Sequence, residues 1–270
     1  MTDTSGQELL AKIDTTRPHS ARVWNYLLGG KDFYPVDREA ADQYKKTFPG
    51  IVDIARTDRA FLGRAVRFLT GEGIRQFLDI GTGLPTMDNT HEVAQRVAPE
   101  CRIVYVDNDP LVLLHAEALL KSSDEGVCDY IDADLRDPDK ILERAAQTLN
   151  FDEPVAIMLL GILHLVPDFA QVHQCVMRLL DAVPPGSYLA LTHATLDFDG
   201  ETTAQAEAQQ EWNKKADPMT PRTRADISRF FDGLQMVEPG LVTMSRWRVE
   251  ATPWGEPAEV AGFCGVGRKP

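Results

Sequence analysis

Short apolar runs alternate with amphipathic segments through most of the chain after residue 73. Runs of strand length lie near residues 75–80, 102–107, 127–132, 154–160 and 187–193. Between them, apolar residues recur at helical spacing near residues 88–98, 110–121, 138–149 and 168–182. Strands that alternate with helices in this way form βαβ units, which build a parallel sheet with helices on both faces. The pattern therefore predicts an α/β fold with a doubly wound, mostly parallel sheet.

The chain before the first predicted strand carries helical patterns only. They cover residues 21–28, 35–44 and 51–69. Gly29 and Gly30 are expected to end the first of these helices, and Pro35 to begin the second. We therefore divide the chain into an N-terminal helical cap or lid over residues 1–72 and a sheet domain over residues 73–270, packed as one compact unit.

The pattern changes again after residue 195. A polar stretch rich in Glu, Gln and Ala over residues 199–216 predicts an exposed helix, and Pro221 is expected to begin another. Residues 234–247 and 259–267 then read as two further strands, which bring the predicted sheet to seven strands. We expect these last two strands to form a closing hairpin.

Two glycines stand at the end of the first predicted strand. Gly81, Thr82 and Gly83 follow its apolar residues, and the polar residues 88–90 then open a helix. A strand, a tight glycine turn and a helix form the geometry of a nucleotide-type cofactor site, because glycine lets the ligand lie close to the backbone. Asp79, two residues before the first glycine, suits a ligand with an ammonium group better than it suits a pyrophosphate.

A second acidic position strengthens this interpretation. Asp107 and Asn108 end the second predicted strand, where an acid holds the ribose hydroxyls of an adenosine cofactor. The alternative is that the glycines only form a tight loop and that Asp107 only caps the next helix. The dinucleotide fingerprint needs a third glycine, but Thr86 stands there after Pro85. This difference and Asp79 favour S-adenosylmethionine over NAD.

The segment D-I-G-T-G-L-P-T at residues 79–86 resembles motif I of class I methyltransferases. Together with R-V-W-N-Y-L-L-G-G-K-D at residues 22–32, it resembles one actinobacterial family of S-adenosylmethionine-dependent methyltransferases of undefined substrate. The resemblance extends from about Arg17 to Arg268. It implies a Rossmann-like, seven-stranded sheet in which the last strand is inserted antiparallel, with S-adenosylmethionine as cofactor and S-adenosylhomocysteine as product.

The resemblance also implies roles for residues after the later strands. Asp134 and Leu135 are expected to contact the adenine, although a helix-capping cluster is the alternative. Gly161 is expected to line the cofactor. His164 and His193 are candidate general bases that face the methyl acceptor; a histidine in an apolar run is otherwise a structural residue.

Residues of the N-terminal segment have two interpretations. Tyr26, Gly29, Gly30 and Lys31 could form a lid over the cofactor, with glycine as hinge and Lys31 reaching a carboxylate. The alternative is a helical cap that covers the sheet edge, in which the glycines only terminate a helix.

Composition narrows the choice of partners. The net charge of −13, from 28 basic and 41 acidic residues, disfavours nucleic-acid binding and favours a small-molecule acceptor or a protein partner. No apolar run approaches membrane-spanning length, and four widely spaced cysteines without C-x-x-C indicate a reduced, cytoplasmic protein. Six histidines form no H-x-x-x-H pair, so no metal site is predicted. A homo-oligomer is compatible with the sequence.

The sequence therefore predicts an S-adenosylmethionine-dependent methyltransferase that acts on an unidentified small molecule by in-line methyl transfer. Two alternatives remain open at this point. One is a non-catalytic S-adenosylmethionine-binding regulatory protein, and the other is an NAD-dependent oxidoreductase.

Overall fold

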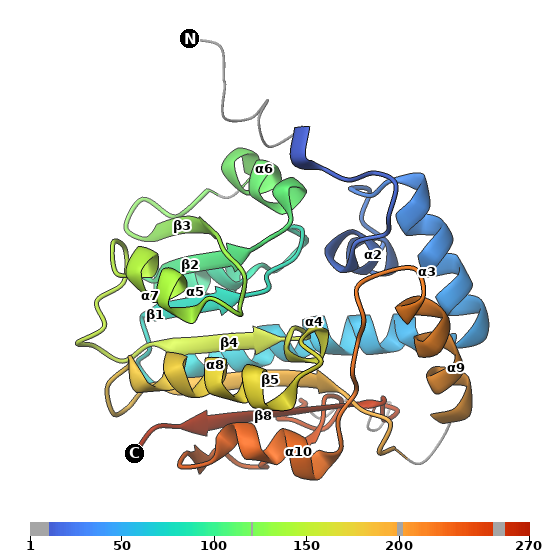
Figure 1. Cartoon of the computed structure of the whole chain (residues 1–270). Helices are drawn as coiled ribbons and strands as arrows, with labels where there is room; N and C mark the ends of the chain where they lie inside the picture. The colour runs from blue at the N-terminus through green and yellow to red at the C-terminus, as the bar shows by residue number, and fades with distance from the viewer. Residues whose placement is uncertain (1–10, 120, 199–201, 251–256) are drawn as a thin grey trace.

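A single twisted sheet runs through the computed structural model, which describes residues 11–119, 121–198, 202–250 and 257–270 (Figure 1). Its strands are β1 (Gln76–Ile80), β2 (Arg102–Asp107), β3 (Val127–Asp132), β4 (Ala156–Leu160), β5 (Tyr188–Ala194), β6 (Gln235–Met236), β7 (Val242–Thr243) and β8 (Gly262–Arg268). The strand order is β3-β2-β1-β4-β5-β8-β6, and β7 pairs with β8 beside β6.

The parallel part of the sheet extends from β3 to β5, and β8 is antiparallel to β5. β6 and β7 are also antiparallel to β8. The predicted doubly wound sheet and the antiparallel insertion of the last strand are thereby confirmed. The order reverses between β1 and β4, and this is the point at which open α/β sheets bind ligands.

The predicted long strand over residues 234–247 was wrong, because only β6 and β7, of two residues each, form there. Pro239 lacks an N–H donor, and Gly240 follows it with a φ of +84°. The Gly240 N–H donates to the Val237 carbonyl at 2.8 Å, which closes a turn. The alternating pattern of the segment predicted a strand, and the Pro-Gly pair divides it.

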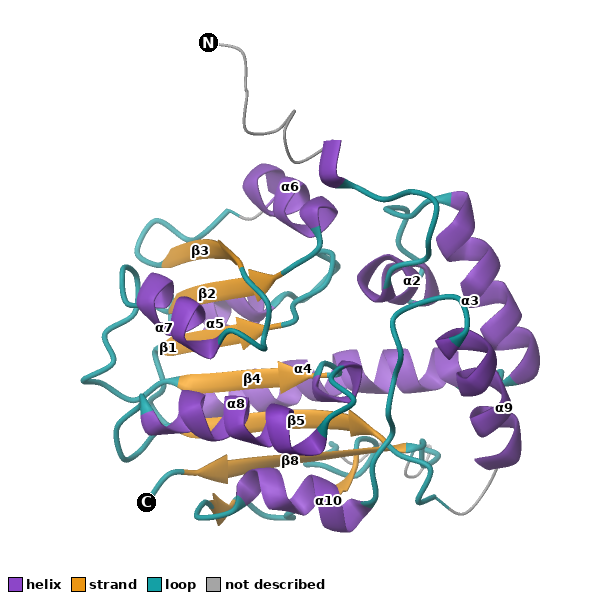
Figure 2. Cartoon of the chain, in the orientation of Figure 1, coloured by secondary structure: helices purple, strands orange, loops and turns teal. Residues whose placement is uncertain are grey.

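Helices cover both faces of the sheet, as Figure 2 shows. They are α2 (Ser20–Leu27), α3 (Pro35–Thr47), α4 (Ile51–Gly71), α5 (Thr90–Val97), α6 (Pro110–Leu119), α7 (Pro138–Ala145), α8 (Phe169–Asp181), α9 (Thr202–Asn213) and α10 (Arg224–Ser228). Alternate residues of β1 point to opposite faces, so Phe77 lies in the core beneath α4 and α5 and Leu78 in the core beneath α7 and α8. Each face of the sheet therefore has its own apolar core.

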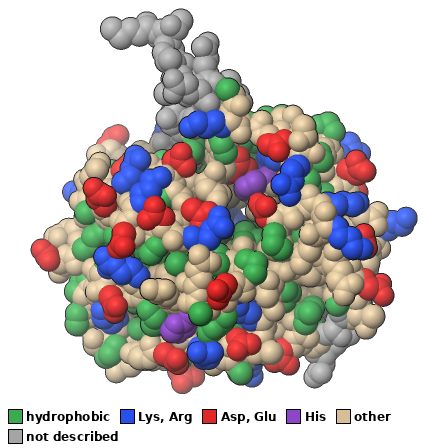
Figure 3. Space-filling view, viewed as in Figure 1, with side chains coloured by type: hydrophobic (Ala, Val, Ile, Leu, Met, Phe, Trp, Pro, Cys, Tyr) green, Lys and Arg blue, Asp and Glu red, His purple; other side chains and the backbone are tan. Residues whose placement is uncertain are grey.

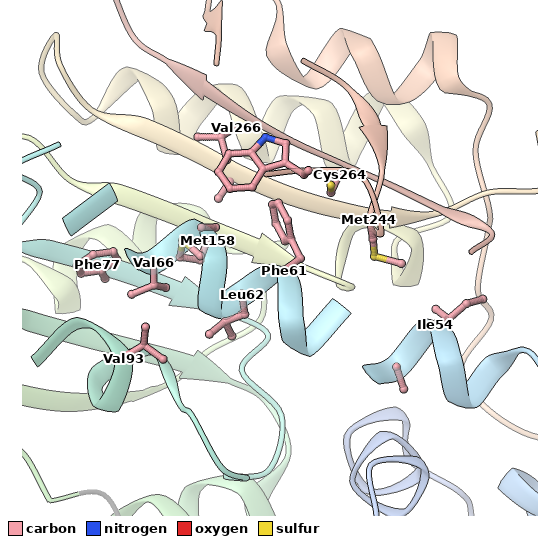
Figure 4. Close-up of a cluster of buried hydrophobic side chains, with 14 of the residues drawn as sticks. Ile54, Phe61, Leu62, Val66, Phe77, Val93, Met158, Met244, Cys264 and Val266 are labelled. Carbon is pink, nitrogen blue, oxygen red and sulfur yellow. The ribbon is translucent and has the colours of Figure 1, made fainter. Parts of the chain in front are cut away.

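The three N-terminal helices occupy two different places. α4 lies along the sheet, where Phe61 and Leu62 pack into the apolar core drawn in Figure 4. The Phe61 ring lies 5.3 Å from the Trp247 ring, measured between centroids. In contrast, α2 and α3 stand beyond the carboxyl ends of the parallel strands (Figure 1). We call α2 and α3 together the roof.

The helix expected within residues 199–216 forms as α9, but the expectation that it is exposed holds for only one of its faces. α9 packs against α3. Trp212 is only 6% exposed, and its ring lies 6.4 Å from that of Tyr44. Gln205 and Gln209 are also buried. A polar sequence concealed this contact because the side-chain NH2 groups of Gln205 and Gln209 donate to backbone carbonyls, which a hydrophobic pattern does not record.

No helix among the described residues is long and apolar enough to cross a membrane. The four cysteines are free thiols.

Candidate functional site

The turn after β1 is closed by a hydrogen bond between the strand and the helix that it joins. Asp79 accepts at Oδ2 from the hydroxyl of Thr90, the first residue of α5, at 2.6 Å. The Asn89 side chain and Glu92 form a capping box at the start of that helix. The carboxylate of Asp79 therefore lies at the carboxyl edge of the sheet with its orientation fixed.

Gly81 lets the turn after β1 approach the turn after β4. Its φ is +77°, and a Cβ at this position would lie 2.6 Å from Ile162 Cδ1. The Gly81 N–H donates to the Val106 carbonyl at 2.8 Å, and the Gly161 N–H donates to the Thr192 carbonyl at 3.3 Å. The structure thus brings the turns after β1 and β4 together at one edge. The predicted cofactor residues in these turns are Gly81, Thr82, Gly83 and Gly161.

Asp107 organises the glycine turn from the end of β2. Its Oδ2 accepts from the Gly83 N–H at 2.8 Å, and its Oδ1 accepts from the Asp109 N–H at 3.0 Å. Burial raises the pKa of this carboxyl, and the two backbone hydrogen bonds oppose that rise. The carboxylate therefore bridges the glycine turn and the start of α6, so it does more than cap the helix that follows.

A second buried acid, Asp58, lies across the same edge from Asp79. It comes from α4, and its Oδ1 accepts from the Thr192 hydroxyl of β5 at 2.5 Å. Asp58 is 9% exposed and Asp79 is 5% exposed. Among the described residues neither carboxylate has an ion pair; the guanidinium of Arg59 instead donates to the Met87 carbonyl at 3.0 and 3.1 Å.

Burial raises the pKa of both carboxyls to about 6. The hydrogen bonds from Thr192 and Thr90 and the charge of Arg59 oppose this rise. For Asp79, repulsion from the negative charges of Asp107 and Asp58 raises the pKa further. Two buried carboxyls without a cation favour a positively charged ligand. Sequence reasoning missed Asp58, although an acid on the apolar face of an amphipathic helix was a usable signal.

The residues after β3 lie close to those after β2. The Asn108 side chain donates to Asp134 Oδ2 at 3.0 Å. Arg136 donates to both oxygens of Asp134, at 2.8 and 2.6 Å, and this side chain holds the pKa of Asp134 below its usual value. Leu135 is buried. The neighbouring Asp137 caps α7 by accepting from a backbone N–H in the first turn of that helix. Asp134 therefore does not cap α7, and it lies at the carboxyl edge of the sheet beside Asn108.

Of the two candidate bases, His193 is bonded within the protein at both ring nitrogens. Nδ1 lies 2.7 Å from the Ala194 carbonyl, and Nε2 lies 3.0 Å from Nη1 of the buried Arg222. Because arginine only donates, Nε2 must accept and Nδ1 must carry the hydrogen. Burial lowers the pKa of His193 well below its usual value. This pattern leaves neither nitrogen for a methyl acceptor.

His164 differs from His193 because its Nδ1 is buried without a hydrogen-bond partner. It lies in the short 3-10 helix Leu163–Leu165 after β4, and its ring centroid is 5.5 Å from that of His193. Burial, with a smaller contribution from the charge of Arg222, lowers the pKa of His164 to about 4. The imidazole is therefore neutral at neutral pH.

The predicted lid residues lie in the roof and in the loop after α2. The Tyr26 hydroxyl donates to Asp42 of α3 at 2.8 Å. A Cβ at Gly30 would lie 2.2 Å from Oδ1 of the buried Asn25, so only glycine lets the chain pass there. The side chain of Lys31 is exposed and makes no ion pair with the described residues. Tyr26 thus faces α3, while Gly29, Gly30 and Lys31 form the turn beside it.

A buried polar network, which sequence reasoning missed, fastens the roof to the end of β2. His19 Nδ1 lies 3.0 Å from Asp109 Oδ2, and Arg22 Nε lies 3.3 Å from Asp37 Oδ1 and 3.9 Å from Asp109 Oδ2. Asp37 and Asp109 are almost wholly buried. Burial lowers the pKa of His19, but the close contact with Asp109 and the negative charges of Asp109 and Asp107 together outweigh burial and raise the pKa above its usual value.

A small apolar cluster lies beside this network. Leu84 of the glycine turn and Leu111 and Val112 of α6 form it, and Ala21 of the roof and Tyr34, the N-cap of α3, pack against it. The roof therefore contacts the turn after β1 directly.

Three features define the class I methyltransferase fold: the strand order, the antiparallel β8 inserted beside β5, and the glycine turn after β1. The chain matches the S-adenosyl methyltransferase family model over residues 6–270 and belongs to that family. No curated protein matches it.

Two solved structures are similar over nearly the whole chain. One is a DUF574-family protein from Streptomyces avermitilis, with 42% identity, a TM-score of 0.91, and coverage of 96% of this chain and 100% of that one. The other is a candidate methyltransferase from Thermobifida fusca, with 41% identity, a TM-score of 0.85, and coverage of 95% and 96%. The protein is thus an S-adenosylmethionine-dependent methyltransferase, as the sequence predicted.

The raised pKa of Asp58 leads to a testable pH dependence. The Asp58 carboxyl has a pKa of about 6 in the folded state, against an ordinary value of 3.8, so between about pH 4 and 6 it stays protonated in the folded protein but ionises in the unfolded chain. The free energy of unfolding therefore falls as the pH rises through this window. The groups that face it are Thr192, Asp79, Cys264 and Arg59. Relative to Asp58→Asn, the unchanged protein should lose up to ~3 kcal/mol of unfolding free energy from pH 4 to 7.

Urea unfolding at each pH measures this difference. Asp53→Asn is the matched control, because Asp53 lies on the same helix but is exposed. A difference curve for Asp58→Asn that is flat from pH 4 to 7 would contradict the assignment.

Proposed function

We propose that this methyltransferase acts on a small-molecule acceptor. The observation that carries the proposal is the roof, which α2 and α3 form beyond the carboxyl ends of the strands and which Arg22, Asp37 and Asp109 fasten in place. A roofed edge admits small molecules more readily than a polymer. On the face in Figure 3, acidic and basic side chains are interspersed, which with the net charge of −13 argues against nucleic acid.

The residues at this edge fit the cofactor by their chemistry. Asp107 would accept from the ribose hydroxyls, and Asp79 would balance the ammonium of the methionine moiety, which its lack of an ion pair favours. Asp134, Asn108 and Leu135 would border the adenine, and the backbone at Gly81, Thr82, Gly83 and Gly161 would approach the cofactor closely. Lys31 would supply the cation for the methionine carboxylate.

S-adenosylmethionine supplies a methyl group that its sulfonium makes electrophilic. The chain must align the acceptor with that methyl group and exclude water. We assign the exclusion of water to the roof and the alignment to the turn at Gly161. The four free thiols fit a reducing compartment, and we place the activity in the cytoplasm.

We assign proton removal from the acceptor, where the acceptor requires it, to His164. His164 is neutral at physiological pH and has an unpartnered nitrogen, whereas both nitrogens of His193 are bonded. His164→Gln should lower methyl transfer about 100-fold or more and leave S-adenosylhomocysteine affinity within about twofold.

The measurement follows tritium from labelled S-adenosylmethionine into an acceptor fraction, beside calorimetry with S-adenosylhomocysteine. His193→Gln is the comparison, and it should lower thermal stability because it breaks the contact with Arg222. Equal transfer by His164→Gln and the unchanged protein would exclude His164 as the base.

The class of acceptor is tested by separating the labelled products of a cell extract by size. We expect tritium in the low-mass fraction. Label in protein or nucleic acid that resists removal of small molecules would overturn the small-molecule proposal.

A further inference from the structure

A cavity of about 460 Å³ opens between the start of α4, the first half of α9 and the segment that precedes β8. Its walls are mostly apolar and include Phe48, Ile54, Phe198 and Val260. Pockets of about 300–1,000 Å³ with apolar walls and a few polar groups are typical small-molecule sites. We call it the α4–α9 cavity.

The cavity adjoins the carboxyl end of β5. Gln205, which lines it, donates from Nε2 to the carbonyl of Thr195 at 3.0 Å, and Thr195 directly follows β5. Ile54 lies one turn of α4, about 6 Å along the axis, before Asp58, and Asp58 is bonded to Thr192 of β5. The cavity is therefore next to the candidate site, and it is bounded by helices that lie outside the βαβ units of the sheet.

One buried polar atom at this cavity lacks a partner. Gln205 is 4% exposed, and its Oε1 has no hydrogen bond. Leaving a buried carbonyl oxygen unsatisfied costs about 1–3 kcal/mol. A bound molecule with an N–H or O–H donor would recover that cost.

The charges that border the cavity are acidic. Asp53 and Glu259 line it, and no Lys or Arg is among its described lining residues. Glu259 is paired with Arg246 at 3.0 Å, whereas Asp53 makes no ion pair with the described residues. The uncompensated negative charge of Asp53 would repel an anionic ligand, but it would not repel a neutral or cationic one.

We propose that the α4–α9 cavity binds the methyl acceptor, and that the acceptor is a neutral or cationic molecule with an apolar, ring-sized body and an N–H donor. This inference rests on the methyltransferase function proposed above. Asp58 at the adjacent edge favours the same charge, because it has no ion pair among the described residues and is not assigned to the cofactor.

Tryptamine serves as the probe, and indole-3-acetate is the matched anion with the same ring. Calorimetry of the full chain with saturating S-adenosylhomocysteine should give millimolar or tighter binding of tryptamine and at least tenfold weaker binding of indole-3-acetate. Ala258→Trp fills the cavity from an exposed position and should abolish tryptamine binding. Gln205→Met should weaken it at least fivefold.

Gln147→Met is the control, because Gln147 is an exposed glutamine in the turn after α7, away from the cavity lining. All variants should bind S-adenosylhomocysteine as the unchanged chain does, which separates the two proposals. Failure of the unchanged chain to bind S-adenosylhomocysteine would overturn the cofactor assignment. Retained cofactor binding, with no tryptamine binding or with binding that Ala258→Trp does not affect, would overturn this inference alone.

Discussion

Asp107→Ala is expected to bind S-adenosylhomocysteine at least 100-fold more weakly than the unchanged protein. Its carboxylate accepts from the backbone of both Gly83 and Asp109, so the substitution removes two charge-assisted hydrogen bonds that shape the glycine turn. It also removes the acceptor proposed for the ribose hydroxyls. A 100-fold loss corresponds to about 2.7 kcal/mol, which is within the range for hydrogen bonds to a charged group.

Asp132→Ala is the matched control for this experiment. Asp132 is the register partner of Asp107 on β3 and lies at the same edge of the sheet, but its side chain is exposed. Its variant should bind S-adenosylhomocysteine within about twofold of the unchanged chain. Calorimetry measures both affinities, and circular dichroism verifies folding. Unchanged affinity in a folded Asp107→Ala variant would remove Asp107 from the cofactor site.

Arg22→Ala is expected to lower the free energy of unfolding by about 3–5 kcal/mol, because it leaves two buried carboxylates without their shared cation. Asp37 is fully buried, and Asp109 is 2% exposed. Arg22 also donates to the carbonyls of Asp14 and Arg17, at 3.0 Å each, and so fastens the start of the described chain.

Urea unfolding followed by circular dichroism measures the effect. Arg22→Lys keeps the charge but loses the planar fork, so it should recover only part of the stability. Arg38→Ala is the control: Arg38 is 65% exposed, pairs with Asp42 at 3.6 Å, and should change stability by less than about 1 kcal/mol. An Arg22→Ala variant as stable as Arg38→Ala would show that the network does not hold the roof.

The parallel sheet and the glycine turn could be predicted because both depend on local patterns. Buried strands require continuous apolar residues, and the strand–turn–helix after β1 requires glycine at Gly81, where a side chain would collide with Ile162. A few adjacent residues meet each of these requirements, so both features can be recognised in the sequence. The family resemblance supplied the inserted antiparallel strand, which β8 confirms.

Contacts between distant segments could not be predicted in the same way. Asp58 meets Thr192 across 134 residues, and Arg22 meets Asp109 only after α2 is placed beyond β2. The burial of α9 depends on Trp212 packing against α3. Periodicity reports which side of a helix is apolar, but it does not report which partner covers a buried acid or amide.

The position of β8 also affects the order in which the chain folds. β8 is the last described strand, yet it lies between β5 and β6, so the sheet cannot be completed until the C-terminal residues pair with strands far earlier in the chain. Pairing across such a sequence distance is slow, because the entropy of closing the loop is lost before the new contacts form. Until then, β5 is an unpaired edge next to the candidate site. The period of greatest aggregation risk therefore precedes the docking of β8.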